Sequence, residues 1–408
     1  MGWFARTTAR RKACALAVLV LATAAALYSV RLSASYVFAS TQPMLSMAIG
    51  GINADAVGRL ATAEFALGQG KARLSAERRR QLIVGLRYDP LSRRAVSALG
   101  LDAEVAGQQD LAERFMKAGD AISRRDKATQ LWLLKEAAER EDWPTTFRHL
   151  DAAISTGEAT WPQLFPLLAQ GLAYPYVREA MKPLVQRGRF WIPPFLTYAI
   201  DNSPNPENIR RLFEESGSPG RRDDLRPLQA KLVARFASLG RIEEASEFAQ
   251  RTMGADKDVL GQIAITPATL DPLFAPLTWQ IIQQPNIAAD PDTDAGSIFF
   301  SASPGPRSAP LTRQLILEPG RYVFSFVAAA PPISEAAQSE WAISCISGNQ
   351  PVLIATIPVT TRSRDGNRAS FDLPARCPGA VFSFVIIGNV EGAEATISIS
   401  NISLIRSS

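Results

Sequence analysis

The stretch "LGLDAEVAGQQDLAERFMKAG", residues 99–119, places three glycines in a segment whose apolar spacing otherwise predicts two amphipathic helices. A glycine inside a helix costs about 1 kcal/mol relative to alanine, so small residues are expected here where two backbones approach closely or where the chain turns. The stretch therefore predicts two short helices packed tightly around a turn.

This order of small and apolar residues resembles the tetratricopeptide repeat, a family of antiparallel helix pairs with a period of 34 residues. The spacing recurs in part along the chain, and its phase slips by about three residues before Gly240 and Ala245 restore it. The resemblance implies helix packing at Leu99, Gly100, Gly107, Ala112, Met116, Leu133, Leu150, Leu167, Ala180, Leu184, Gly240 and Ala245. The alternative is a generic helical bundle whose register coincides by chance.

Prolines mark where the pattern departs from the family. Pro162, Pro166 and Pro175 interrupt the third unit. Because proline disrupts helix interiors, units in this part of the chain are expected to be short or irregular. We place the repeat region at residues 50–265.

The chain has 408 residues, which suits two or three domains, and a net charge of +5. The positive charge is not arranged as a phosphate track, because residues 271–408 hold eight arginines and eleven acidic residues. Basic runs such as "ERRRQ" at 77–81 are expected to be solvated helix faces. We expect no nucleic-acid partner.

The N-terminus predicts a membrane anchor. Eighteen uncharged residues, Ala13 to Val30, lie between Lys12 and Arg31, and four positive charges precede them. A helix of that length spans about 27 Å, close to the hydrocarbon core of a bilayer. The charge asymmetry holds residues 1–12 in the cytoplasm, makes residues 13–31 a transmembrane helix, and sends the bulk of the chain into the periplasm of a bacterium.

Two other interpretations of this segment remain open. A cleavable signal peptide would be cut after small residues such as those at 24–26 or 37–39 and would also export the body. A buried N-terminal helix of a cytosolic protein fits poorly with the basic flank.

Export agrees with cysteine usage, because Cys345 and Cys377 form an even pair that an oxidising compartment would join. Two unpaired buried thiols are the alternative.

The periodicity changes from helical to alternating near residue 277. "LTRQLILEPGRYVFSFVAA", residues 311–329, predicts two strands around a Pro-Gly turn, and "ISISNISLI" predicts a closing strand. Eight or nine strands are expected, which suits an antiparallel β-sandwich over residues 277–406. The overall fold class is thus a transmembrane helix, an α-helical repeat superhelix and a C-terminal β domain.

The strand and turn pattern of residues 314–326 resembles jelly-roll carbohydrate-binding modules, also called galactose-binding-like domains. Those modules bind sugars by stacking aromatic rings on the pyranose. The resemblance implies that sugar-stacking residues would be found among Trp279, Phe299, Phe300 and Trp341, although all four could equally be core aromatics.

"DPDTDAG" at 290–296 places Asp290, Asp292 and Asp294 at alternate positions, as at the start of a calcium loop. The glycine falls one place late and Ser301 stands where a bidentate glutamate is needed, so a solvated turn is the favoured interpretation and no metal or other cofactor is expected.

No catalytic motif is present. The single histidine, His149, has no metal-ligand partner nearby in sequence, and the sequence contains no phosphate-binding glycine loop and no nucleophile elbow. We therefore expect a binding protein rather than an enzyme.

Two functions remain. The first is a membrane-anchored periplasmic scaffold that binds envelope proteins, within cell-envelope or exopolysaccharide assembly. The second is glycan binding by the β-sandwich, with the helical repeats as a spacer.

Overall fold

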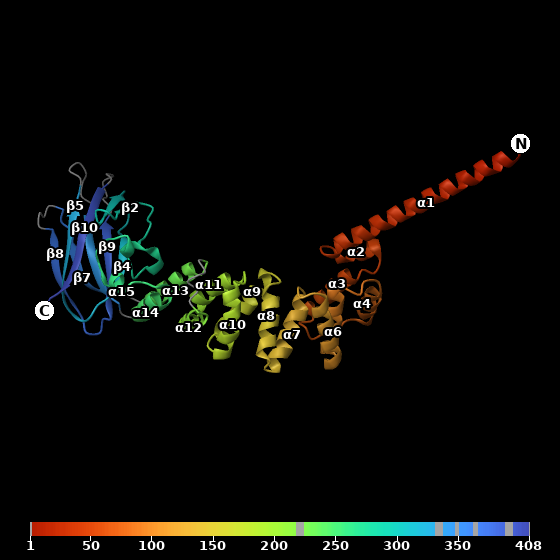
Figure 1. The fold of residues 1–408 in the computed structure, drawn as a ribbon, viewed down its shortest axis with the longest axis horizontal. Coiled ribbons are helices and arrows are strands. Elements are labelled where there is room, and N and C mark those ends of the chain that lie inside the picture. The colour runs from red at the N-terminus through yellow and green to blue at the C-terminus, as the bar shows by residue number, and fades with distance from the viewer. Residues whose placement is uncertain are drawn as a thin grey trace. The chain divides into compact units, whose positions relative to one another are not determined.

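The computed structural model describes residues 2–217, 224–330, 338–346, 351–361, 366–387 and 395–407, with side chains from residue 15 onward. The chain divides into two compact units, residues 1–164 and 165–408, and each is described by itself. Helices make up the first unit and the start of the second, and two antiparallel sheets follow (Figure 1).

The described helices follow the predicted spacing over part of the chain. Three alternate helices begin 34 residues apart, at Arg93, Lys127 and Trp161, and the next begins three residues early, at Ile192. The helices are α1 (Gly2–Ala39), α2 (Pro43–Gly50), α3 (Ala54–Leu67), α4 (Ala76–Tyr88), α5 (Arg93–Val105), α6 (Gln109–Ile122), α7 (Lys127–Glu139), α8 (Trp143–Ile154), α9 (Trp161–Gly171), α10 (Pro175–Arg187), α11 (Ile192–Asn202), α12 (Glu207–Glu215), α13 (Arg226–Ser238), α14 (Ile242–Met253) and α15 (Lys257–Gly261).

The small residues of the opening stretch lie at a close helix contact and at a turn. A Cβ built on Gly100 in α5 would come within 2.8 Å of the Met116 Cε in α6. Gly107 has a φ of +72° in the turn between these helices, where a side chain would be strained. Ala112 is fully buried five residues later. The same arrangement recurs between α13 and α14, where Gly240 has a φ of +74° and Ala245 is fully buried.

Two of the packing residues named from the 34-residue spacing are misplaced in the third helix pair. Leu167 is exposed, and its neighbour Leu168 is buried in its place. Ala180 is half-buried, while Met181 beside it is fully buried. Burial at these two positions is thus offset by one residue, in the part of the chain that carries Pro166 inside α9. The remaining side chains in the set, at positions 99, 133, 150 and 184, are buried.

Ion pairs join side chains that are about one repeat apart in sequence. Within the first unit, Glu104 in α5 accepts hydrogen bonds from the Trp132 Nε1 at 3.0 Å and the Lys135 Nζ at 2.9 Å, both in α7. In the second unit, Lys231 in α13 pairs with Asp201 in α11 at 2.6 Å. These contacts hold α5 against α7 and α11 against α13.

The N-terminal helix α1 ends in a tight hairpin with α2 (Figure 1). The segment Ala15–Ala39 has a mean hydropathy of 2.0 and is long and apolar enough to cross a membrane or to act as a signal sequence. Ser35 in α1 and Ser46 in α2 are buried against each other, with their hydroxyl oxygens 3.1 Å apart. The Asn53 side-chain amide donates to the Ser35 hydroxyl at 3.3 Å, so α1, α2 and the start of α3 are held together.

Two five-stranded antiparallel sheets follow in the described part of the second unit, in the orders β1-β4-β9-β6-β7 and β2-β3-β10-β5-β8. The two strands predicted around Pro319 are β4 and β5, and they belong to different sheets. The strands are β1 (Gln280–Ile281), β2 (Ile287–Asp292), β3 (Ser297–Ala302), β4 (Ser308–Ile316), β5 (Gly320–Ala329), β6 (Gln338–Cys345), β7 (Val352–Pro358), β8 (Asn367–Leu373), β9 (Gly379–Ile387) and β10 (Ala395–Arg406).

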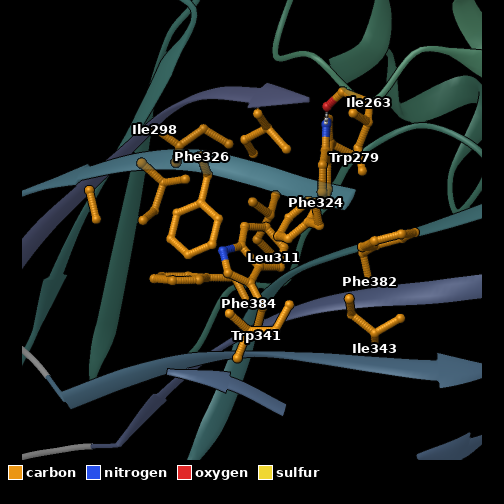
Figure 2. Close-up of a cluster of buried hydrophobic side chains, with 14 of the residues drawn as sticks. Ile263, Trp279, Ile298, Leu311, Phe324, Phe326, Trp341, Ile343, Phe382 and Phe384 are labelled. Carbon is orange, nitrogen blue, oxygen red and sulfur yellow. Dashed lines mark hydrogen bonds between the residues drawn. The ribbon is translucent and has the colours of Figure 1, made fainter. Parts of the chain in front are cut away.

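The core between the two sheets is aromatic, and it extends beyond the predicted start of the sandwich at residue 277. Figure 2 shows Trp279 as part of this core, with its indole Nε1 donating to the Ile263 carbonyl at 3.0 Å. The fully buried Arg313 of β4 donates to the carbonyls of Val259 and Leu260, at 2.9 and 3.3 Å. The segment before residue 277 is therefore bonded into the sandwich.

The predicted disulfide is present. Cys345 at the end of β6 is bonded to Cys377, which lies just before β9, with the two Cα atoms 5.6 Å apart. The bond closes a sequence separation of 32 residues. It therefore ties a strand to the loop that precedes the neighbouring strand.

Candidate functional site

Two exposed tyrosines form a stacked pair at the start of α10. The ring centroids of Tyr174 and Tyr176 lie 5.6 Å apart with an interplanar angle of 26°. Tyr174 is 56% exposed and Tyr176 is 40% exposed. Pro175 separates them at the first position of the helix, so its fixed φ helps to set the direction of the flanking side chains. Large exposed aromatic surface of this kind is enriched at protein interfaces.

A buried arginine holds the turn that carries this tyrosine pair. Arg178 is 4% exposed, and its Nη1 donates to the carbonyls of Leu172 and Ala173, at 2.9 and 3.3 Å. Its Nε donates to the Glu215 carboxylate of α12 at 3.1 Å. Arg178 thus links the turn before Tyr174 to α12. A turn that is already fixed loses less conformational entropy when a partner binds.

The second candidate surface is the outer face of the sheet that contains β3 and β10. Phe299 of β3 is 40% exposed there, opposite Asp290 of β2 on one side and Ser398 of β10 on the other. Directly opposed residues in antiparallel strands share a face, with Cβ atoms about 5 Å apart. An exposed ring flanked by a carboxylate and a hydroxyl can offer both stacking and hydrogen bonding to a sugar.

The other three residues in the predicted sugar-stacking set are unavailable to a ligand. Trp279, Phe300 and Trp341 are at most 1% exposed and lie in the aromatic core between the sheets. Phe324 packs edge-on against Trp341 with ring centroids 5.2 Å apart. The prediction was wrong for these three because strand alternation separates two faces without showing which one is inside.

The three aspartates of the weak calcium candidate lie at the exposed end of β2 and in the turn after it. Asp290 and Asp292 are exposed on the strand, and the Asp292 carboxylate accepts a hydrogen bond from the Ala295 backbone N–H at 3.0 Å. Within the described ranges, no three acidic, histidine or cysteine side chains are grouped so that they could hold a metal ion. The geometry is that of a hydrogen-bonded turn.

His149 belongs to a buried hydrogen-bonded chain. Its Nδ1 lies 2.8 Å from the Gln130 Oε1, and its Nε2 lies 3.2 Å from an Arg148 guanidinium nitrogen. Because a guanidinium can only donate, Nε2 accepts and Nδ1 carries the proton. Burial, reinforced by the positive charge of Arg148, lowers the pKa of His149 below its ordinary value. The residue is a satisfied core histidine.

A shallow depression lies between α12 and α14, lined by Phe213, Glu214, Arg251 and Thr252. The Glu214 carboxylate already accepts a hydrogen bond from Arg210 at 2.7 Å. The acid that lines the depression is therefore already paired within α12.

Comparison with known proteins gives structural neighbours only. No protein-family model matches the sequence, and no curated protein matches it. Similar solved structures include one described as "CBM4 structure and function", at 16% identity and a TM-score of 0.22 over 32% of this chain and 94% of that one. Another is "Family 16 Carbohydrate Binding Module-2", at 12% identity and a TM-score of 0.22 over 30% of this chain and 86% of that one.

A third similar structure concerns "carbohydrate- binding modules from the beta-sandwich super family", at 13% identity and a TM-score of 0.21 over 27% of this chain and 47% of that one. Each of these three solved structures matches 27–32% of this chain. At these identities and TM-scores, the similarity supports no conclusion about what this chain binds.

Proposed function

We propose that the protein is an interaction scaffold anchored in a bacterial inner membrane by α1, with its bulk in the periplasm. In this proposal the helix pairs are tetratricopeptide-like and bind an envelope protein, and the sandwich is a jelly roll. The four positive charges before the apolar segment support the orientation. The 34-residue spacing of helix starts and the alternation of small buried residues with turn glycines support the repeat assignment.

The observation that carries the proposal is the tyrosine pair. Tyrosine offers a large, rigid contact area with a polar tip at a low cost in conformational entropy. Tyr174 and Tyr176 are exposed on a turn that Arg178 holds in place, so a partner would meet a preformed surface. The expected occupant is the surface of a partner protein with an apolar pocket for one of the rings.

Co-purification from crosslinked membranes tests this function. The full chain is used because the segment before residue 277 is bonded into the sandwich and a truncation there would expose its core. Replacing both tyrosines by alanine removes an interface centre that is typically worth about 2 kcal/mol or more, so recovery of the partner should fall about 30-fold.

The matched control is Phe190→Ala, because Phe190 is 61% exposed but lies after the other end of α10. This variant should retain the partner. Recovery of the same proteins in the same amounts with Tyr174→Ala/Tyr176→Ala would contradict the proposal.

Glycan binding by the sandwich is a second candidate, favoured by one observation. Phe299 exposes its ring between Asp290 and Ser398 on an outer face, an arrangement suited to one sugar ring. Electrophoresis of the full chain through gels that contain envelope polysaccharide tests it, since a bound chain is retarded. Phe299→Ala should abolish the retardation, and Ile405→Ala, an exposed apolar residue of the same sheet, should leave it unchanged. Equal mobility of all three proteins in the presence of the polysaccharide would contradict this candidate.

A further inference from the structure

We propose that one end of the first unit docks on anionic phospholipid head groups through an exposed patch on and beside α4. The patch, called the lipid patch below, consists of Ile52, Arg80, Ile83, Arg87, Tyr88 and Leu91. The inference rests on the proposed membrane anchoring of α1 and goes beyond it, because it fixes which end of the helical unit faces the bilayer.

The hairpin between α1 and α2 determines how far the next residues lie from the end of the proposed membrane-spanning segment. The Arg31 guanidinium donates to the Ile49 carbonyl near the end of α2, so α2 runs back along α1 toward the predicted membrane boundary. Residues 32–54, which form the end of α1, all of α2 and the start of α3, contain no charged side chain. A segment without charges can lie against the bilayer interface at little cost.

The start of α3 is also held close to the end of the proposed membrane-spanning segment. Asn53 precedes α3, its side chain caps the first turn by accepting from the backbone N–H of Asp55 at 3.1 Å, and its amide donates to Ser35 in α1. Ser35 lies four residues, or about 6 Å of helix rise, beyond Arg31. The beginning of α3 is therefore within a few residues of the end of the proposed span.

The C-terminal end of α4 packs on this start of α3. A Cβ built on Gly85 would come within 3.0 Å of the Ala54 Cα, which shows how closely the two backbones approach. Tyr88 lies three residues after Gly85, and Leu91 follows in the turn before α5. Figure 1 shows α2, α3 and α4 grouped at the inner end of α1. The exposed residues around Tyr88 are thus at the end of the first unit that adjoins the span.

These residues are unusually exposed for their size and type. Tyr88 is 81% exposed and Leu91 is 71% exposed, and Ile52 and Ile83 also expose apolar surface. Apolar side chains left exposed beside a membrane span have the bilayer interface as their nearest apolar environment. Tyrosine in particular prefers the boundary between head groups and hydrocarbon.

The arginines of α4 separate into two groups. Arg78 pairs with Glu64 at 2.8 Å and Arg79 pairs with Asp102 at 2.7 Å, so both bind within the first unit. Arg80 and Arg87 are exposed, and the described residues offer neither of them an ion pair. Seven residues apart, they lie on one face of the helix.

Ile83 lies between these two arginines on the same face, so cationic and apolar side chains alternate along it. Cations of this kind are attracted to anionic lipid within about a Debye length of the surface. A protein partner could use the same residues, but the short connection to the span favours the lipid surface.

Depth-dependent fluorescence quenching on the full chain tests the proposal. Cys345 and Cys377 are bonded, so Cys14→Ser leaves the chain without a free thiol. A fluorophore is then attached at Pro90→Cys, which is exposed beside the lipid patch and leaves its six residues intact. The matched control site is Leu111→Cys in α6, which follows the far end of α5. Each protein is reconstituted into phosphatidylcholine vesicles with and without phosphatidylglycerol, both carrying a head-group spin label.

The expected result is quenching at residue 90 that is several times stronger than at residue 111 and that requires phosphatidylglycerol. Arg80→Gln/Arg87→Gln should abolish the difference, whereas Arg114→Gln/Arg125→Gln, a pair of exposed arginines elsewhere in the unit, should not. Equal quenching at both sites, or quenching at residue 90 that is independent of phosphatidylglycerol or of Arg80 and Arg87, would overturn the proposal.

A fluorophore at Leu21→Cys separates failure of this inference from failure of the anchor. Quenching at residue 21 by spin labels placed deep in the acyl chains reports the span itself. If residue 21 is quenched and residue 90 is not, only the lipid patch is overturned. If neither is quenched, the proposed anchoring is overturned as well.

Discussion

Gly58 in α3 lies against the backbone of Arg94 in α5, where a Cβ built on the glycine would come within 2.7 Å of the Arg94 carbonyl carbon. The Arg94 guanidinium pairs with the Asp55 carboxylate one turn earlier in α3, at 2.5 Å. Helices α3 and α5 are thus held by a close backbone crossing and an ion pair at the same place. This relationship explains why helices in this chain tolerate residues that bury little surface.

Gly58→Ala should destabilise the first unit although alanine is the better helix former. The gain in helix propensity is about 1 kcal/mol, but the clash is with backbone atoms that cannot rotate away, so a net loss of about 1 to 3 kcal/mol is expected. Gly171→Ala is the control, because its nearest neighbour would be an ordinary contact at 3.5 Å. Chemical unfolding of both variants checks this, and a neutral Gly58→Ala would refute the close crossing.

Ala112→Leu and Ala245→Leu should each overpack a helix contact, because both alanines are fully buried. The expected cost is about 1 to 3 kcal/mol of unfolding free energy. Ala118→Leu in α6 adds the same side chain at an exposed position and should be nearly neutral. Unfolding midpoints that fall equally in all three variants would show that burial at residues 112 and 245 is not the cause.

The sequence predicts the helix pairs where glycine and alanine stand at fixed offsets, as at Gly107 and Ala112. It fails in α9, the helix that contains Pro166, because a one-residue offset exchanges Leu167 for Leu168 at the interior. The hairpin between α1 and α2 went unpredicted. The uncharged run from residue 32 to residue 54 was a usable signal for it, since such a run must either pack or meet lipid.

Removing the disulfide should destabilise the sandwich. In the chain-entropy description, closing 32 residues between Cys345 and Cys377 contributes about 3 to 4 kcal/mol. The variant Cys345→Ser/Cys377→Ser should therefore unfold at lower denaturant, as followed by the fluorescence of the buried tryptophans. Mass spectrometry of protein alkylated without reductant checks that the bond forms in the cell envelope. Two freely alkylated thiols there would contradict the bond and would leave the exported location supported by the N-terminal segment alone.

Acidification should weaken the first unit through His149. The folded state holds the pKa of this residue below its ordinary value by burial, so the unfolded state binds a proton more readily. The neutral, buried His149 makes its full contribution to the unfolding free energy above about pH 6.5. That contribution is lost as the pH falls below this value. His149→Gln removes the only histidine in the chain, so the decrease in unfolding free energy between about pH 7 and about pH 5 should be smaller than in the wild type. An unchanged decrease would contradict this.

The two candidate surfaces differ in how far the sequence reveals them. Alternation in the strands brings Phe299 into the sugar-stacking set together with Trp279 and Trp341, and only the packed sheets separate the exposed ring from the buried ones. Tyr174 and Tyr176 went unpredicted because the turn that carries them is held by Arg178, which itself bonds to Glu215, a residue far from the turn in sequence. A tyrosine on each side of a proline at a helix start was the only local signal.

Site-specific photocrosslinking in intact cells tests the scaffold proposal most directly. A benzophenone amino acid at position 174 should crosslink to one or a few envelope proteins, because the turn presents this side chain outward. The same amino acid at position 190, which is as exposed but lies past the other end of α10, should give none of those products. Discrete products at position 174 that are absent at position 190 are the predicted result. No product at position 174, or the same products at both positions, would contradict the proposal that the helix pairs bind a partner through the tyrosine pair.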